Sequence, residues 1–145
     1  MESWELAARE SVRDTIARYA HAGDRFRLRE LAECFTSEGV LEIKGSHRAQ
    51  GREAIVSMLG DDVGASRPAR DGFFVRHFVT NIHFDAVTRH RIDTSAYFMV
   101  LTDRGPDHWG RYRDAFEPVG TDWLLAHRLA AVDTAVTDGW AAGRS

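Results

Sequence analysis

The sequence contains a single cysteine, Cys34, among its 145 residues. One cysteine cannot form a disulfide within the chain, and chains without disulfides are typical of reducing compartments. No CxxC or Cys/His pattern surrounds Cys34, so we interpret it as a structural thiol. We therefore expect a cytoplasmic protein.

The sequence also lacks a long apolar run and a large excess of charge of one sign. No stretch approaches the ~20 apolar residues of a membrane span, and no secretory leader pattern precedes the predicted fold. The net charge is -3 and the pI is about 6.1, with arginines scattered among acidic residues. We expect neither a membrane nor a nucleic acid as partner.

Several motifs that carry chemistry in other proteins are absent. No glycine-rich loop joins a predicted strand to a helix, which gives no support to nucleotide binding. No GxSxG elbow is present, and Cys34 has no evident catalytic partner. A metal held by His77, His108 and Asp24 is the weaker alternative. We expect no metal and no cofactor.

The composition fits one globular domain over residues 1–145, because 43% of the residues are hydrophobic and 28% are charged. Apolar residues at helical spacing predict three helices, and a short alternating run predicts a strand. The region between the helices and the second half is rich in Gly, Asp and Arg, and is a connector or a lid. The predicted helices are 4–22, 25–35 and 51–60, the strand is 40–45, and the loop is 60–72.

Four alternating segments fill the second half of the chain. Their short connections predict antiparallel neighbours. We therefore expect an α+β fold, a cone-shaped roll in which three N-terminal helices pack on a strongly curved, mostly antiparallel sheet. The wide end of such a cone can be a ligand pocket. The four predicted strands are 73–87, 90–103, 107–119 and 122–136.

Counting every second residue shows which side chains share a face of each strand. In the first long strand His77 and Val79 fall on one face with Asn81 and His83. In the third strand one face combines aromatic and titratable side chains: His108, Gly110, Tyr112, Asp114 and Phe116. In the last strand Arg128 is the one charge in an apolar row, so it is paired inside or lies at the sheet end: Leu124, Ala126, Arg128, Ala130 and Val132.

Tyr19 and Asp24 raise the question of what the end of the first helix faces, because a plain core would use aliphatic side chains there. His77 can exchange a proton near neutral pH, and Asp24 can orient its ring. A Tyr19 hydroxyl can hold a substrate oxygen. We interpret His77, Asp24 and Tyr19 as catalytic candidates. The candidate substrate-binding residues are Arg128, His108, Tyr112, Asp114 and Asn81.

Each candidate also has a purely structural interpretation. Asp24 immediately precedes the second predicted helix, which is a natural N-cap position. Asp114 is a ready ion-pair partner for Arg111, Arg113 or Arg128. His77 and Tyr19 could be satisfied core residues, and His108 could be a solvated histidine beside a turn.

Four segments, in order, resemble the SnoaL-like branch of the nuclear-transport-factor-2-like superfamily, and they span nearly the whole chain. They are "IARYAHAGDRFRLRELAECFTSEGVLEI", "GREAI", "RHFVTNIHFD" and "GRYRDAFEPVGTDWLLAHRLAAVD". The resemblance is nearest to the scytalone dehydratase and bile-acid 7α-dehydratase-like members. It implies that the cone is lined by Tyr19, Asp24, His77 and Arg128.

The same resemblance suggests that His108 occupies the place of a second catalytic histidine, and that Asp114 matches the strand aspartate of polyketide cyclases. It implies a cofactor-free lyase or isomerase, namely a dehydratase, double-bond isomerase or cyclase. The substrate would be a small hydrophobic oxygenated molecule, such as a polyketide or steroid-like compound.

Two alternatives remain from the sequence. The chain could be a non-catalytic module that binds a small ligand or a protein, or a structural subunit like the small subunit of ring-hydroxylating dioxygenases. We also expect a homo-oligomer, a dimer or trimer, because the outer face of the predicted sheet carries Trp109 and other apolar groups.

Overall fold

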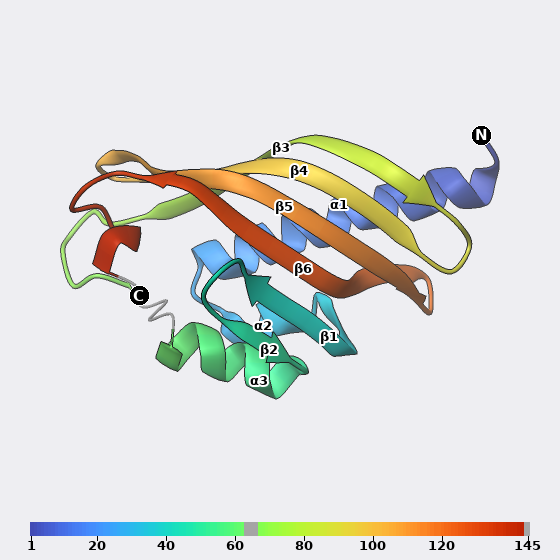
Figure 1. Cartoon of the computed structure of the whole chain (residues 1–145), viewed down its shortest axis with the longest axis horizontal. Coiled ribbons are helices and arrows are strands. Elements are labelled where there is room, and N and C mark those ends of the chain that lie inside the picture. The colour runs from blue at the N-terminus through green and yellow to red at the C-terminus, as the bar shows by residue number, and fades with distance from the viewer. Residues whose placement is uncertain (63–66, 144–145) are drawn as a thin grey trace.

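The computed structural model describes residues 1–62 and 67–143 (Figure 1). The helices are α1 (Ser3–Asp24), α2 (Leu28–Ala32) and α3 (Arg52–Ser57), followed by a π-helical turn at Met58–Asp62 and a 3-10 turn at Ala141–Gly143. The strands are β1 (Phe35–Ile43), β2 (Arg48–Gln50), β3 (Val75–Val87), β4 (Ile92–Thr102), β5 (Gly105–Val119) and β6 (Asp122–Ala135). None of the described helices is both long enough and apolar enough to span a membrane.

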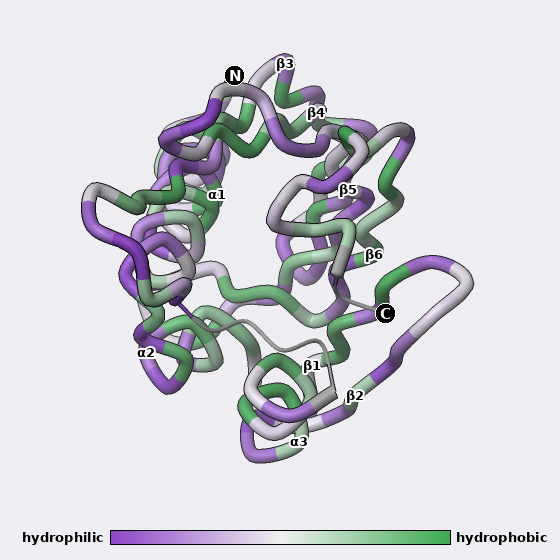
Figure 2. The backbone as a smooth tube through the Cα atoms, turned by 90° about the vertical axis from the view of Figure 1, so that its left-hand side faces the viewer, coloured by the Kyte–Doolittle hydropathy of each residue, from purple (hydrophilic) through white to green (hydrophobic). Residues whose placement is uncertain are grey.

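One six-stranded sheet has the order β2-β1-β6-β5-β4-β3. β1 runs parallel to β6, and the other neighbours are antiparallel. In the end view α1 and α2 lie opposite β3–β6, and β1 and α3 lie at the base (Figure 2). The predicted fold class is confirmed: helices pack on a curved, mostly antiparallel sheet. β3–β6 agree with the four predicted strands to within two residues at each end.

The core lies between α1 and the concave face of the sheet. α1 buries one stripe at helical spacing, including Val12, Ile16 and Tyr19. β4 buries every second residue from Ile92 to Thr102, which matches the period of a strand with one covered face. Each large apolar side chain buried in this way contributes about 1.5–3 kcal/mol. These contacts fix α1 across the inner face, so that its last turn reaches β3.

The segment predicted as a second helix over 25–35 is wrong at both ends. Only Leu28–Ala32 is α-helical, and β1 already begins at Phe35. Phe35 pairs with Leu125 of β6, and the amide of Leu125 donates to the carbonyl of Cys34 at 2.8 Å. The neighbouring strand therefore draws residues 35–39 into the sheet, a long-range effect that local spacing does not contain.

The third predicted helix, 51–60, is shorter in the structure. α3 ends at Ser57, and a π-helical turn carries the chain from Met58 to Asp62. β2, three residues long, was not predicted. The predicted loop 60–72, a connector or a lid, includes residues 63–66, which lie outside the described part of the chain.

Bulges shift two of the predicted strand faces. In β3 the register changes between Thr80 and His83, and Asn81 adopts a left-handed φ of 56°. Because a bulge adds one residue to one strand, the alternation reverses beyond it. Ile82 and Phe84 therefore join the core, while Asn81 and His83 are exposed. The prediction that Asn81 and His83 share the face of His77 is wrong.

A similar shift occurs in β6. Phe116 pairs with Leu125 and Asp114 pairs with Arg128, so an extra residue lies between these two ladder positions. Residues directly opposite one another share a face of the sheet. Leu125 and Arg128 are thus both internal, whereas Leu124 pairs with the exposed Glu117 on the other face. The predicted row was correct for Arg128 and Ala130, and wrong for Leu124.

Candidate functional site

Asp24 and His77 form a close pair where the end of α1 meets β3. Nδ1 of His77 lies 2.6 Å from Oδ1 of Asp24, and the backbone amide of His77 donates to both carboxylate oxygens at 3.1 Å. The side chains are 18% and 12% exposed for His77 and Asp24 respectively. The structure therefore brings together two residues that are 53 positions apart.

Local structure explains the contact. Asp24 is the last residue of α1, while the N-cap of α2 is Arg27, which makes no side-chain cap bond. The predicted N-cap role of Asp24 is wrong. β3 is an edge strand, whose outward amides lack strand partners. The Asp24 carboxylate satisfies the His77 amide and thereby holds the ring beside it.

The bond at Nδ1 defines the chemistry of the His77 ring. A carboxylate only accepts hydrogen bonds, so Nδ1 carries the proton and Nε2 of the neutral ring carries the lone pair. Nε2 of His77 makes no hydrogen bond with the described residues. It is therefore available as a proton acceptor.

His77 lines a small, partly open cavity of about 90 Å³. The walls come from α1, α2, β3, β5, the π-helical turn and the C-terminal segment. Most of the lining is apolar or aromatic, and two histidines supply the titratable groups. The lining residues are Tyr19, Gly23, Phe26, Leu28, Leu31, Leu59, His77, His108 and Trp140. The structure thus brings Tyr19, His77 and His108 together in one cavity wall.

A second histidine–carboxylate pair lies in the same cavity wall. Nδ1 of His108 lies 2.8 Å from Oδ2 of Asp107. The same carboxylate accepts the amides of Trp140 at 2.6 Å and Ala141 at 3.0 Å. Burial raises the pKa of Asp107, but the hydrogen bonds from His108, Ala141 and Trp140 outweigh that effect and leave the pKa below its ordinary value.

Arg128 and Asp114 form a buried, two-pronged ion pair behind this cavity. Nε and Nη2 of Arg128 donate to the two carboxylate oxygens at 2.9 and 2.8 Å. The guanidinium lies 3.7 Å from the ring centroid of Tyr112 and 4.3 Å from that of Tyr19. Neither Arg128 nor Asp114 is among the residues that line the cavity. Of the alternatives for Asp114, the ion pair with Arg128 is the one observed.

This pair affects the two tyrosines. Burial raises the pKa of Tyr19, and the nearby positive charge of Arg128 offsets only part of that rise. Burial likewise raises the pKa of Tyr112. Both hydroxyls therefore stay protonated near neutral pH and can donate a hydrogen bond. Tyr112 stacks on Phe98 with ring centroids 4.5 Å apart, and only Tyr19 of the two reaches the cavity.

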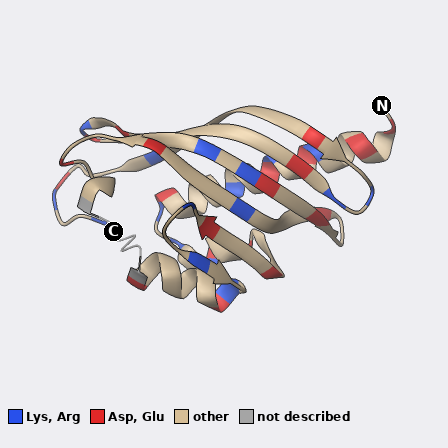
Figure 3. Cartoon of the chain, in the orientation of Figure 1, with Lys and Arg blue, Asp and Glu red and all other residues tan. Residues whose placement is uncertain are grey.

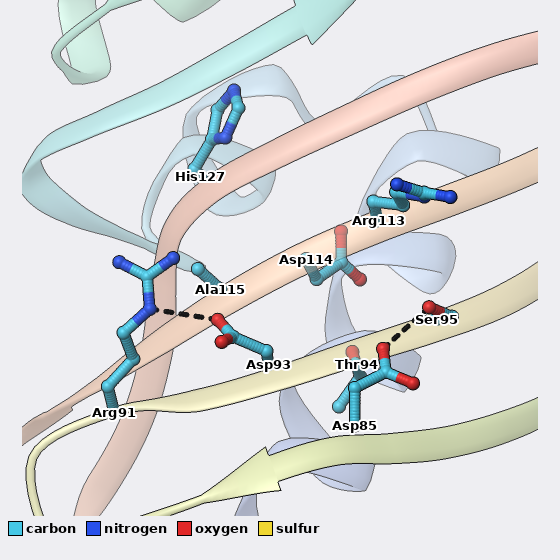
Figure 4. A pocket seen from close by; sticks show the side chains of 9 residues that line it. All are labelled: Asp85, Arg91, Asp93, Thr94, Ser95, Arg113, Asp114, Ala115 and His127. Carbon is cyan, nitrogen blue, oxygen red and sulfur yellow. Dashed lines mark hydrogen bonds and ion pairs between the residues drawn. The ribbon is translucent and has the colours of Figure 1, made fainter.

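Larger hollows lie outside this cavity. A groove of about 310 Å³ between α1 and β3 includes Asp24 and His77 in its wall, so the pair separates this groove from the cavity. Another hollow, of about 410 Å³, lies over the sheet and is polar (Figure 4). There Arg91 pairs with Asp93 and Ser95 with Asp85.

Asn81 belongs to neither the cavity nor the groove. It lies in a third surface hollow with His83 and Tyr97. The structure does not bring Asn81 near the Asp24–His77 pair.

Sequence reasoning missed Asp107 and Trp140. The adjacent acid and histidine at 107–108 were a usable signal, because a strand-end carboxylate can hold the neighbouring ring. The place of Trp140 had no local signal, since it depends on how the tail folds back.

The described residues contain no cluster of three His, Cys, Asp or Glu side chains that could hold a metal ion. Acidic and basic residues are interspersed along the strands rather than gathered by sign (Figure 3). At the cavity, the titratable and hydroxyl side chains are His77 with Asp24, His108 with Asp107, and Tyr19.

Comparison with known families identifies the family of this chain. The SnoaL-like domain family matches residues 4–129. The chain belongs to the SnoaL-like domain family. This confirms the resemblance predicted from the sequence. No curated protein matches the chain at a significant level.

Several solved structures are similar to this chain in fold. A Catenulispora acidiphila protein, solved in complex with S-DNPA, is 28% identical with a TM-score of 0.74, covering 88% of this chain and 95% of its own. A candidate scytalone dehydratase from Novosphingobium aromaticivorans is 20% identical with a TM-score of 0.75, covering 100% and 99%. ActVI-ORFA from Streptomyces coelicolor is 21% identical with a TM-score of 0.73, covering 86% and 96%. The last two likenesses support the fold alone.

Proposed function

We propose that this SnoaL-like protein is a cofactor-free lyase or isomerase that abstracts a proton next to a carbonyl of a small, hydrophobic, oxygenated substrate. One observation carries the proposal: the Asp24 carboxylate holds Nδ1 of His77 at 2.6 Å, and His77 lines an apolar cavity. A base oriented by a carboxylate in an apolar site is the arrangement that general base catalysis requires.

Each side chain has a separate role in the proposed reaction. The substrate carbonyl accepts a hydrogen bond from the protonated hydroxyl of Tyr19. Nε2 of His77 takes the α-proton, the C–H electron pair becomes the enolate, and Asp24 stabilises the imidazolium. The proton then returns from His77 to another carbon, which shifts a double bond, or passes to a β-hydroxyl, which leaves as water. His108 is placed to bind that second polar group.

Arg128 and Asp114 support the site from behind. Their ion pair places a fixed positive charge over the face of Tyr19. We assign Arg128 a positioning role for Tyr19, rather than the direct substrate contact predicted from the sequence. Tyr112 completes the same stack.

The experiment is exchange of the α-protons of cyclopentanone in D₂O, followed by proton NMR. The wild-type protein should accelerate exchange above the buffer rate. His77→Ala should lose about 10²–10⁴-fold of that acceleration, the usual contribution of a general base. His83→Ala is the matched control, because His83 is an exposed histidine on the same strand.

Two results would contradict the proposal: no exchange above buffer in the wild type, or equal exchange in wild type and His77→Ala. Binding of cyclopentanone without exchange would instead favour the non-catalytic module. The tautomer of His77 gives an independent check, because its ¹⁵N shifts should show Nδ1 protonated in the wild type and should change in Asp24→Asn.

A further inference from the structure

The segment after β6 turns back and places Trp140 in the cavity wall. The turn begins where the amide of Val136 donates to the carbonyl of Asp107 at 2.8 Å. It ends where the Asp107 carboxylate accepts the amides of Trp140 and Ala141. One residue, through its backbone and its side chain, therefore holds this segment at both ends.

The indole of Trp140 lies among aromatic rings. Its centroid lies 6.1 Å from that of Phe26, 5.9 Å from Phe73 and 6.4 Å from His108. Aromatic pairs at these separations attract one another beyond the gain from burial. The ring position is thus fixed by packing as well as by the backbone bonds.

Because the cavity is small, the position of the Trp140 indole affects which ligands fit. An apolar protein cavity of about 150 Å³ accommodates benzene, whereas the cavity here measures about 90 Å³. With Trp140 in place, the cavity is therefore too small for two fused rings and takes at most one small ring. A larger ligand needs the indole to move or to be smaller.

We propose that Trp140, held in place by Asp107, is the residue that sets the upper size limit of the ligand. The ligand class that fits is a compact, flat molecule of about one unsaturated ring with an oxygen substituent, packed among the rings of the wall. The inference rests on one part of the proposed function, which is that this cavity is the ligand site. It adds a specificity role for a residue outside the Asp24–His77 pair.

The test compares dissociation constants for phenol and 2-naphthol, measured by ligand-observed NMR titration. The size preference is the ratio of the two constants. Trp140→Ala should shift this ratio toward 2-naphthol by about tenfold or more, since pocket volume discriminates ligands by such factors. Trp140→Phe should give an intermediate shift and serves where the alanine variant does not fold.

The matched control is Trp109→Ala, which removes an indole from the outer face of β5 and should leave the ratio at the wild-type value. Asp107→Asn should shift the ratio in the same direction as Trp140→Ala, by a smaller factor. An unchanged ratio in both Trp140 variants overturns the inference, as does equally tight binding of both probes by the wild type. The exchange assay reports the proposed function separately, since it depends on His77.

Discussion

The buried Arg128–Asp114 pair predicts a large loss of stability when its acid is removed. Arg128 is 0% exposed and the Asp114 side chain is 1% exposed. Removing one partner of a buried pair leaves an uncompensated charge, which costs about 3–5 kcal/mol. Since domains of this size have about 5–15 kcal/mol of stability in total, Asp114→Ala should lower the free energy of unfolding by a large fraction.

Urea unfolding followed by circular dichroism measures this loss. With an m-value of about 2 kcal/mol/M, a loss of 4 kcal/mol lowers the midpoint by about 2 M. The chain contains its own control: Arg111 and Asp133 join the same two strands at 3.1 Å, but their side chains are 48% and 45% exposed. Asp133→Ala should therefore cost only about 0–1 kcal/mol.

The reasoning also predicts a rescue. Replacing both members of the buried pair, as Asp114→Leu with Arg128→Met, should recover much of the stability, because no charge then lies unpaired in the core. Equal losses in Asp114→Ala and Asp133→Ala would refute the argument. The argument would also be refuted if the two substitutions were simply additive, so that the double variant lost the cost of the Asp114 change plus the full cost of the Arg128 change.

Three further predictions concern single positions. Gly110→Ala should destabilise by about 1–3 kcal/mol in urea unfolding, because an added Cβ would lie 1.9 Å from the carbonyl oxygen of Ala131; a neutral effect would contradict this backbone approach. The lowered pKa of Asp107 means that its contribution to stability is present above the unfolded carboxyl pKa of about 3.9 and is lost as pH falls through the folded value. Acid titrations of thermal stability should therefore be shallower in Asp107→Asn below about pH 4. Burial raises the pKa of the Cys34 thiol, so a colorimetric disulfide reagent at pH 8 should label it only under denaturing conditions; fast labelling of the folded protein would be the contrary result.

Much of the fold could be predicted because the second half has strong alternation. β4 buries every second residue, and β3 alternates between half-buried and exposed side chains up to its bulge. Such a pattern is local to each strand. The bulges at Asn81 and between Leu125 and Arg128 could not be found in this way, because period-two counting assumes an unbroken register. Phe35 was misassigned to a helix for a related reason, since its partner Leu125 is 90 residues away in the sequence.

The residues of the candidate site likewise differ in whether the sequence carries a signal for them. Asp24, His77 and Tyr19 were chosen as candidates from their side-chain chemistry, and the family resemblance supplied the long-range pairing that spacing lacks. Asp107 was missed because a carboxylate beside a turn is usually solvated, and only the returning tail buries it. Trp140 was missed because its position also depends on how the C-terminal segment folds back.

Both carboxylates at the cavity have two roles, and this determines how variants should be interpreted. Asp24 holds the ring and the backbone amide of His77, while Asp107 holds the ring of His108 and the amide of Trp140. Replacing either acid therefore changes the support of a histidine ring and the position of a chain segment together. Replacing either histidine removes only the ring and leaves the backbone bonds in place. An acid variant thus keeps the ring and loses the backbone contact, whereas a histidine variant loses the ring and keeps the backbone contact, so comparing the two separates the contribution of the ring from that of backbone positioning at each pair.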